Sequence, residues 1–83
     1  MNEYDFTVIL KNLSEMTEAA ANALFESGCD DGSPASSEGQ AWVTFHRNAE
    51  SLEEAIRSAI ADVQSAGFSV AKVELEPEGL AKT

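Results

Sequence analysis

The sequence predicts one small α+β domain, and its length, its composition and its hydrophobic pattern support this. The chain has 83 residues, which is room for a single hydrophobic core. Apolar residues make up 43% of it and charged residues 24%, an ordinary balance for a folded domain. Its apolar residues alternate in some segments and recur at helical spacing in others. We expect a single domain over residues 1–76 and a C-terminal tail over residues 77–83.

The first half of the chain is predicted to form a strand, a helix and a weak strand. Residues 4–10 are rich in β-branched and aromatic types, and the apolar side chains at positions 4, 6, 8 and 10 alternate with those at 5, 7 and 9, which is typical of a strand. Ser14 is the expected N-cap of the helix, and Gly28 is expected to end it. Because Pro34 cannot donate a hydrogen bond to a neighbouring strand, we place residues 33–37 in a strand at the edge of the sheet.

The second half of the chain is predicted to form a strand, a helix and a final strand. Residues 41–46 carry the clearest alternation in the sequence. Ser51 and Glu54 have the spacing of a capping box, in which each side chain bonds a free backbone N–H group at the helix start. The apolar stripe of this helix, with Ile60 at its centre, consists of Leu52, Ile56, Ala59, Ile60 and Val63. The final strand covers residues 70–75.

This order of elements is the split βαβ, or ferredoxin-like, plan βαββαβ. In that plan two helices cover one face of a four-stranded antiparallel sheet with the spatial order 4-1-3-2. The strand that contains Pro34 then falls at an edge. The side chains expected beneath the helices are Phe6, Val8, Leu10, Val43, Phe45, Val73 and Leu75.

The charge of the chain excludes several classes of partner. Fifteen carboxylates face five Lys and Arg residues, which leaves a net charge of −10 and a pI near 4.2. Nucleic-acid binders and proteins of anionic membranes use clustered positive charge, so we expect neither kind of partner. The N-terminus is acidic where a signal peptide is basic, and no apolar run reaches the length of a membrane span. We therefore expect a cytoplasmic protein.

The residues able to carry chemistry are too few to predict an enzyme. Cys29, Asp30 and Asp31 follow one another in the chain, and His46 could complete a metal set. Structural zinc, however, needs four nitrogen or sulfur ligands, and two acids beside a thiol disfavour the thiolate. We expect Cys29 to pack as a small apolar residue, and Asp30 and Asp31 to stay hydrated or support a turn. No catalytic residue, metal or cofactor is predicted.

One face of the predicted sheet is a candidate interaction surface. If the residues listed above lie under the helices, alternation turns Trp42, Ile9 and Val70 to the opposite face. The candidate partner-binding residues on that open face are Trp42, Ile9, Thr7, Thr44, His46 and Val70. Exposed apolar patches mark interaction sites, and Trp is frequent in binding hot spots. The alternative is that Trp42 only covers neighbouring Thr and Lys stems or is shielded by the tail.

Two segments of the chain resemble a bacterial family. Residues 23–31 (ALFESGCDD) and 51–63 (SLEEAIRSAIADV) are similar to the N-terminal domain of small, largely uncharacterised bacterial proteins. In those relatives a helix-turn-helix DNA-binding segment often follows. The similarity covers roughly residues 6–76, and these 83 residues contain no such segment, so DNA binding does not carry over. The resemblance implies an accessory domain for oligomerisation or partner contact in a bacterial regulatory system.

These observations favour a non-enzymatic protein-interaction or oligomerisation module that binds a protein partner or a second copy, as in a homodimer. The first alternative is a small-ligand sensor of the ACT-like kind. Such a sensor carries a glycine-rich turn between its first strand and first helix, which this sequence lacks. The second alternative is an orphan small hydrolase, for which a concave pocket with convergent polar groups would be the evidence.

Overall fold

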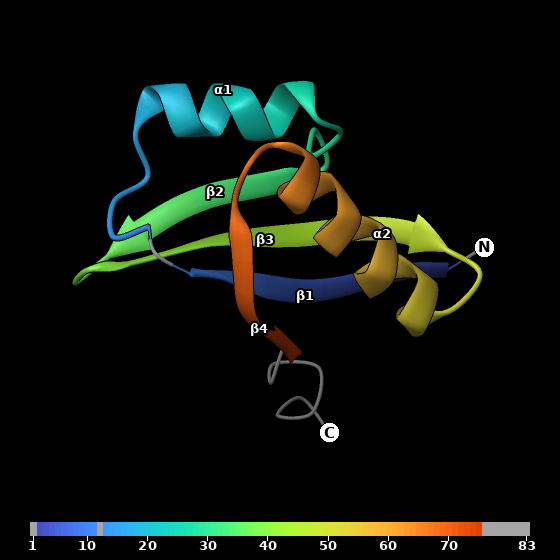
Figure 1. Cartoon of the computed structure of the whole chain (residues 1–83). Helices are drawn as coiled ribbons and strands as arrows, with labels where there is room; N and C mark the ends of the chain where they lie inside the picture. Colours follow the sequence, from blue (N-terminus) through green and yellow to red (C-terminus); the bar gives the residue numbers. More distant parts are fainter. Residues whose placement is uncertain (1, 12, 76–83) are drawn as a thin grey trace.

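The computed structural model describes residues 2–11 and 13–75, so the tail expected over residues 77–83 lies outside the described residues. Its elements, in chain order, are β1 (Asn2–Lys11), α1 (Glu18–Glu26), β2 (Gly32–Ser37), β3 (Gln40–Ala49), α2 (Leu52–Ser65) and β4 (Ser69–Leu75). The four strands form one antiparallel sheet, accompanied by the two helices (Figure 1). The predicted α+β class is confirmed.

The sheet has the strand order β2-β3-β1-β4, so the two longest strands lie at its centre. The register of β1 and β3 aligns Phe6 with Phe45 and Ile9 with Trp42. The rings of Phe6 and Phe45 stack with their centroids 5.5 Å apart. The edge strand β2 contains Pro34, at a position where a missing N–H group is tolerated.

The core lies between the helices and one face of the central strands. Alternate residues of β1 and β3 are buried together with residues of both helices, and α2 packs against β1, β3 and β4 (Figure 1). The fully buried members of this cluster are Phe6, Val8, Leu10, Leu24, Ala41, Val43, Phe45, Ala55, Ala59 and Val63. Burying these side chains is the main force that holds the two layers together.

Helix α1 begins later than the sequence predicts. Its N-cap is Thr17, whose side-chain oxygen accepts a hydrogen bond from the Ala20 N–H at 3.1 Å, so the prediction of Ser14 was wrong. The backbone N–H of Met16 donates to Ser36 Oγ of β2 at 2.9 Å. This tertiary contact holds the chain against the sheet edge before the helix starts.

Helix α2 begins as predicted but faces the sheet differently. Ser51 Oγ accepts from the Glu54 N–H at 3.2 Å, which confirms Ser51 as the N-cap, one half of the predicted capping box. Ala55, Ala59 and Val63 are the buried residues, whereas Ile60 is half-buried, so its central position was predicted wrongly. Because Ala55, Ala59 and Val63 form the side of the helix that faces the sheet, Ile60, one residue after Ala59, lies on the helix flank.

One residue expected beneath the helices is exposed. Leu75 leaves 53% of its surface accessible, although its neighbour Val73 packs against the core. Leu75 is the last residue of β4, and β4 is an edge strand with a neighbour, β1, on one side. The end of an edge strand is covered less than the centre of a sheet, which explains why alternation alone overestimated the burial of Leu75.

Candidate functional site

Four of the predicted interaction residues lie together on the sheet face that points away from the core. Thr7 and Ile9 of β1 alternate with the buried Phe6 and Val8, and they pair across the strands with Thr44 and Trp42 of β3. The two threonine hydroxyls are 3.4 Å apart and share a hydrogen bond. The alternation of side chains along the strands therefore predicted the residues at the centre of this face correctly.

A shallow hollow of about 420 Å³ lies on this face. It is lined by Thr7, Ile9, Gln40, Trp42, Lys72 and Glu74. Because β1 lies between β3 and β4, Thr7 and Ile9 form the floor, Trp42 stands on one side and Lys72 with Glu74 on the other. Lys72 Nζ and Glu74 Oε2 form an ion pair at 3.2 Å. We call this region the sheet-face hollow.

The apolar members of the sheet-face hollow are already partly covered. Ile9 is only 8% exposed although it lies opposite the helices. Its cross-strand neighbours are Trp42 on one side and Lys72 on the other, whose long side chains shield it. Trp42 is half-buried. The indole thus protects Ile9 within the chain and still presents part of its surface to a partner.

Thr44, His46 and Val70 are not among the residues that line the hollow. His46 lies further along β3, where its Nδ1 is 2.8 Å from Asp5 Oδ1. Val70 packs against the core on the helix side, so its predicted place on the open face was wrong. The cause is a β-bulge: Ile9 pairs with Lys72 but Leu10 pairs with Val70, which leaves Ala71 as an extra residue in β4.

Three residues of the sheet-face hollow were missed. Lys72 and Glu74 flank the inward-facing Val73, and Gln40 precedes the buried Ala41, so the same alternation could have placed all three on the open face. The prediction named the polar Thr7, Thr44 and His46 beside the apolar residues of this face, but it did not include these three.

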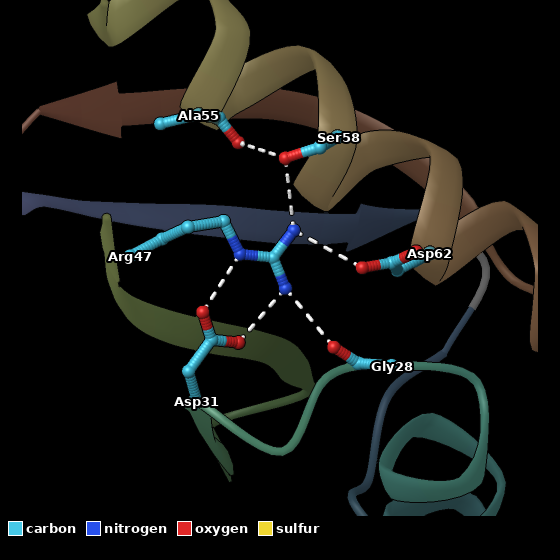
Figure 2. A network of polar contacts seen from close by, with 6 residues as sticks. All are labelled: Gly28, Asp31, Arg47, Ala55, Ser58 and Asp62. Carbon is cyan, nitrogen blue, oxygen red and sulfur yellow. Dashed lines mark hydrogen bonds and ion pairs between the residues drawn. The ribbon is translucent and has the colours of Figure 1, made fainter. Parts of the chain in front are cut away.

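Arg47 forms a polar junction among three elements, which the sequence analysis did not identify (Figure 2). Its guanidinium donates from Nε and Nη2 to the two carboxylate oxygens of Asp31, at 2.7 and 2.8 Å. Nη1 lies 3.0 Å from both Asp62 Oδ2 and Ser58 Oγ, and Nη2 donates to the Gly28 carbonyl at 3.0 Å. We call these contacts the Arg47 junction. It joins β3 to α2 and to the connection between α1 and β2.

The Arg47 junction stabilises the fold, and all three nitrogens of the guanidinium are engaged by groups of the same chain. The Arg47 side chain is 11% exposed, and its guanidinium carbon lies 4.9 Å from the centre of the Phe45 ring. The hydrogen bond between the two side chains raises the pKa of Arg47 and lowers that of Asp31. Asp31 is therefore an ion-pair partner, where a hydrated or turn-supporting carboxylate was expected. The alternation of residues 41, 43 and 45 does place position 47 on the inner face.

Cys29 is a buried member of the core cluster, in agreement with the prediction that it packs as a small apolar residue. Burial first, and then the charge of Asp62, raise the pKa of its thiol to about 11. The thiolate is thus disfavoured at neutral pH. Over residues 2–11 and 13–75, no three His, Cys, Asp or Glu side chains are grouped to hold a metal ion.

Charge is divided unequally over the molecule. Strand alternation places three carboxylates and two lysines on the open sheet face, namely Glu3, Asp5, Lys11, Lys72 and Glu74. Elsewhere, the described part of the chain carries ten carboxylates against Arg47 and Arg57. The open face therefore has a net charge of −1, whereas the remaining described residues have a net charge of −8.

Comparisons with protein-family models, with curated proteins and with solved structures found no match for this chain. Within the part of the chain that the structure describes, no helix has both the length and the apolar character needed to cross a membrane.

Proposed function

We propose that this chain is a non-enzymatic protein-interaction module of the ferredoxin-like type, and that the sheet-face hollow is its contact surface for a second copy or a protein partner. The order of the elements and the strand order β2-β3-β1-β4 are compatible with that fold type. The observation that carries the proposal is the position of Trp42, half-buried beside Ile9, on a sheet face whose described residues have a net charge of only −1.

Electrostatics favours this face for association. Two chains of net charge −10 repel each other, and the repulsion is weakest where little charge is brought into contact. The open face contributes a net charge of only −1. A partly exposed indole next to Ile9 supplies the kind of anchor that dominates binding energies in protein interfaces.

The setting of the module is part of the same proposal. The similarity of residues 23–31 and 51–63 to bacterial N-terminal domains supports an accessory role in a cytoplasmic regulatory system of a bacterium. The low local charge of the open face and the excess of carboxylates elsewhere argue against nucleic acids and anionic membranes as partners.

Truncation of Trp42 tests the proposal. Sedimentation equilibrium over a concentration series compares the parent with Trp42→Ala and with the control Phe25→Ala, whose ring is 63% exposed on α1. We expect Trp42→Ala to weaken self-association or the retention of a stoichiometric partner by about tenfold or more, and Phe25→Ala to leave both unchanged. Equal behaviour of the parent and Trp42→Ala would show that the sheet-face hollow is not the contact surface.

A further inference from the structure

A second apolar surface lies on the helix side of the molecule, along one flank of α2. Leu52, Ile56 and Ile60 line a groove of about 460 Å³ together with Glu53 and Arg57. The three apolar residues are spaced four apart, so they form one continuous row on the helix surface. We call this row and its two charged neighbours the α2 groove.

Two other sides of α2 make contacts within the fold, whereas this flank is only partly covered. Ala55 and Ala59 are buried against the sheet, and Ser58 and Asp62 contact Arg47 on the opposite flank (Figure 2). Leu52 and Ile56 pack partly on the core, whereas Ile60 is half-buried and is not among the residues that contact the core cluster. The row therefore keeps apolar surface that no described side chain covers completely.

The surroundings of the α2 groove are acidic. Glu53 lines the groove itself, and Glu50 and Glu54 line the adjoining hollow at the start of the helix. Of the two arginines in the described residues, Arg47 is bound in its junction, and Arg57 forms an ion pair with Glu53 four residues earlier. Residues 50–65 carry four carboxylates, Glu50, Glu53, Glu54 and Asp62, against the single Arg57, so α2 and its start have a net charge of −3.

The negative charge around the α2 groove determines which kind of partner it favours. A second copy would bring two acidic α2 helices together, and anionic lipid would be repelled in the same way. A positively charged segment is attracted instead, and a row of apolar residues on a helix fits the apolar face of a partner helix. We propose that the α2 groove binds a basic amphipathic helix of a partner protein. Its apolar residues would contact Leu52, Ile56 and Ile60, and its Lys or Arg residues would face the flanking glutamates.

A designed peptide tests this inference without knowledge of the natural partner. The probe is a helical peptide with Leu at every fourth position and Lys beside the Leu row, and a second peptide carries Glu in place of each Lys. Titration into the labelled protein, followed by amide chemical shifts, locates the site and measures the affinity. We expect the Lys peptide to bind at Leu52, Ile56 and Ile60, with an affinity that falls as salt rises. We expect no binding of the Glu peptide.

Variants distinguish binding of the peptide in the α2 groove from its general attraction to an acidic surface. Ile60→Ser should lower the affinity for the Lys peptide by about tenfold. The control Phe25→Ser, at an exposed apolar residue of the other helix, should leave this affinity unchanged. Arg57→Gln removes the positive charge at the groove and should strengthen binding a few-fold. Folding of each variant is checked by its amide spectrum, and Ile60→Val provides a milder substitution.

Several results would overturn the inference. Equal binding to the parent and Ile60→Ser, or to the Lys and Glu peptides, would show that the groove does not recognise a basic helix. A parent dimer that Ile60→Ser dissociates would assign the groove to a second copy. The inference does not depend on the sheet-face hollow, because Trp42→Ala should bind the Lys peptide as the parent does. Loss of binding in Trp42→Ala would place the peptide on the sheet face and refute the groove.

Discussion

Arg47 holds Asp31 through two parallel hydrogen bonds, from Nε at 2.7 Å and from Nη2 at 2.8 Å. This bidentate geometry uses the planar fork of the guanidinium and is stronger than a single contact between point charges. Asp31 lies directly before β2, and Arg47 lies near the end of β3. The pair therefore fixes the connection between α1 and β2 to the central part of the sheet.

Replacing Arg47 with Lys should destabilise the fold. A lysine keeps the charge but cannot reproduce the fork, and it leaves Asp31, Asp62 and the Gly28 carbonyl with fewer donors. We expect Arg47→Lys to lower the free energy of unfolding by about 1–3 kcal/mol, measured by urea denaturation. The matched control is Arg57→Lys, at a side chain that is 76% exposed, which should change stability by less than about 0.5 kcal/mol. Equal effects of the two substitutions would contradict the structural role of the Arg47 junction.

The loss of folding stability at alkaline pH should depend on Cys29. The folded state raises the pKa of this thiol from 9.0 to about 11, so the folded protein holds the proton more tightly than the unfolded chain does. The resulting contribution is fully present below pH 9 and is lost as the pH rises toward about 11. Urea unfolding across this range should show a smaller loss of stability for Cys29→Ala than for the parent. Parallel pH curves for the two proteins would rule the thiol out as the cause.

The two sides of α2 should respond differently to truncation. Val63 is fully buried against the sheet, whereas Ile60 is half-buried on the flank. We expect Val63→Ala to cost about 2 kcal/mol of unfolding free energy, and Ile60→Ala to cost less than about 1.5 kcal/mol although it removes more atoms. Thermal or urea unfolding of the two variants side by side decides this. A larger loss of unfolding free energy for Ile60→Ala than for Val63→Ala would show that Ile60 lies at the centre of the core.

Gly28 should not tolerate a side chain. Its φ is +110°, and a Cβ atom there would lie 3.0 Å from the carboxylate of Asp62, which already contacts Arg47. Gly28→Ala is expected to lower the free energy of unfolding by about 1–3 kcal/mol through backbone strain and displacement of Asp62. Gly39→Ala is the control, because its φ is +80° but nothing lies within 4 Å of the added atom. A cost at Gly28 no greater than at Gly39 would mean that contact with Asp62 is unimportant.

Much of the candidate site followed from short-range pattern. Side chains of a strand alternate between faces, so the burial of Phe6 and Val8 placed Thr7 and Ile9 on the open face, and the burial of Ala41 and Val43 did the same for Trp42 and Thr44. The cap at Ser51 was equally local, because a hydroxyl bonds the N–H group three residues later.

The features that sequence reasoning did not find depend on contacts between distant segments. The bulge at Ala71 exists only in the pairing of β4 with β1, and it carries Val70 to the helix side. The start of α1 at Thr17 accompanies a hydrogen bond from Met16 to Ser36, twenty residues away in the chain. Likewise, the side of α2 that faces the sheet is set by its packing against β1, β3 and β4.

The sequence by itself thus determined the α+β class, the sign of the charge and the two faces of the central strands, since each follows from residues that are neighbours in the chain. Only the tertiary structure decided how the charge is distributed. It brought Asp31, Asp62 and Arg47 into one junction, gathered a near-neutral set of residues on the open sheet face and left the flank of α2 uncovered. Electrostatic and packing energies depend on distances in space, which a linear pattern does not specify.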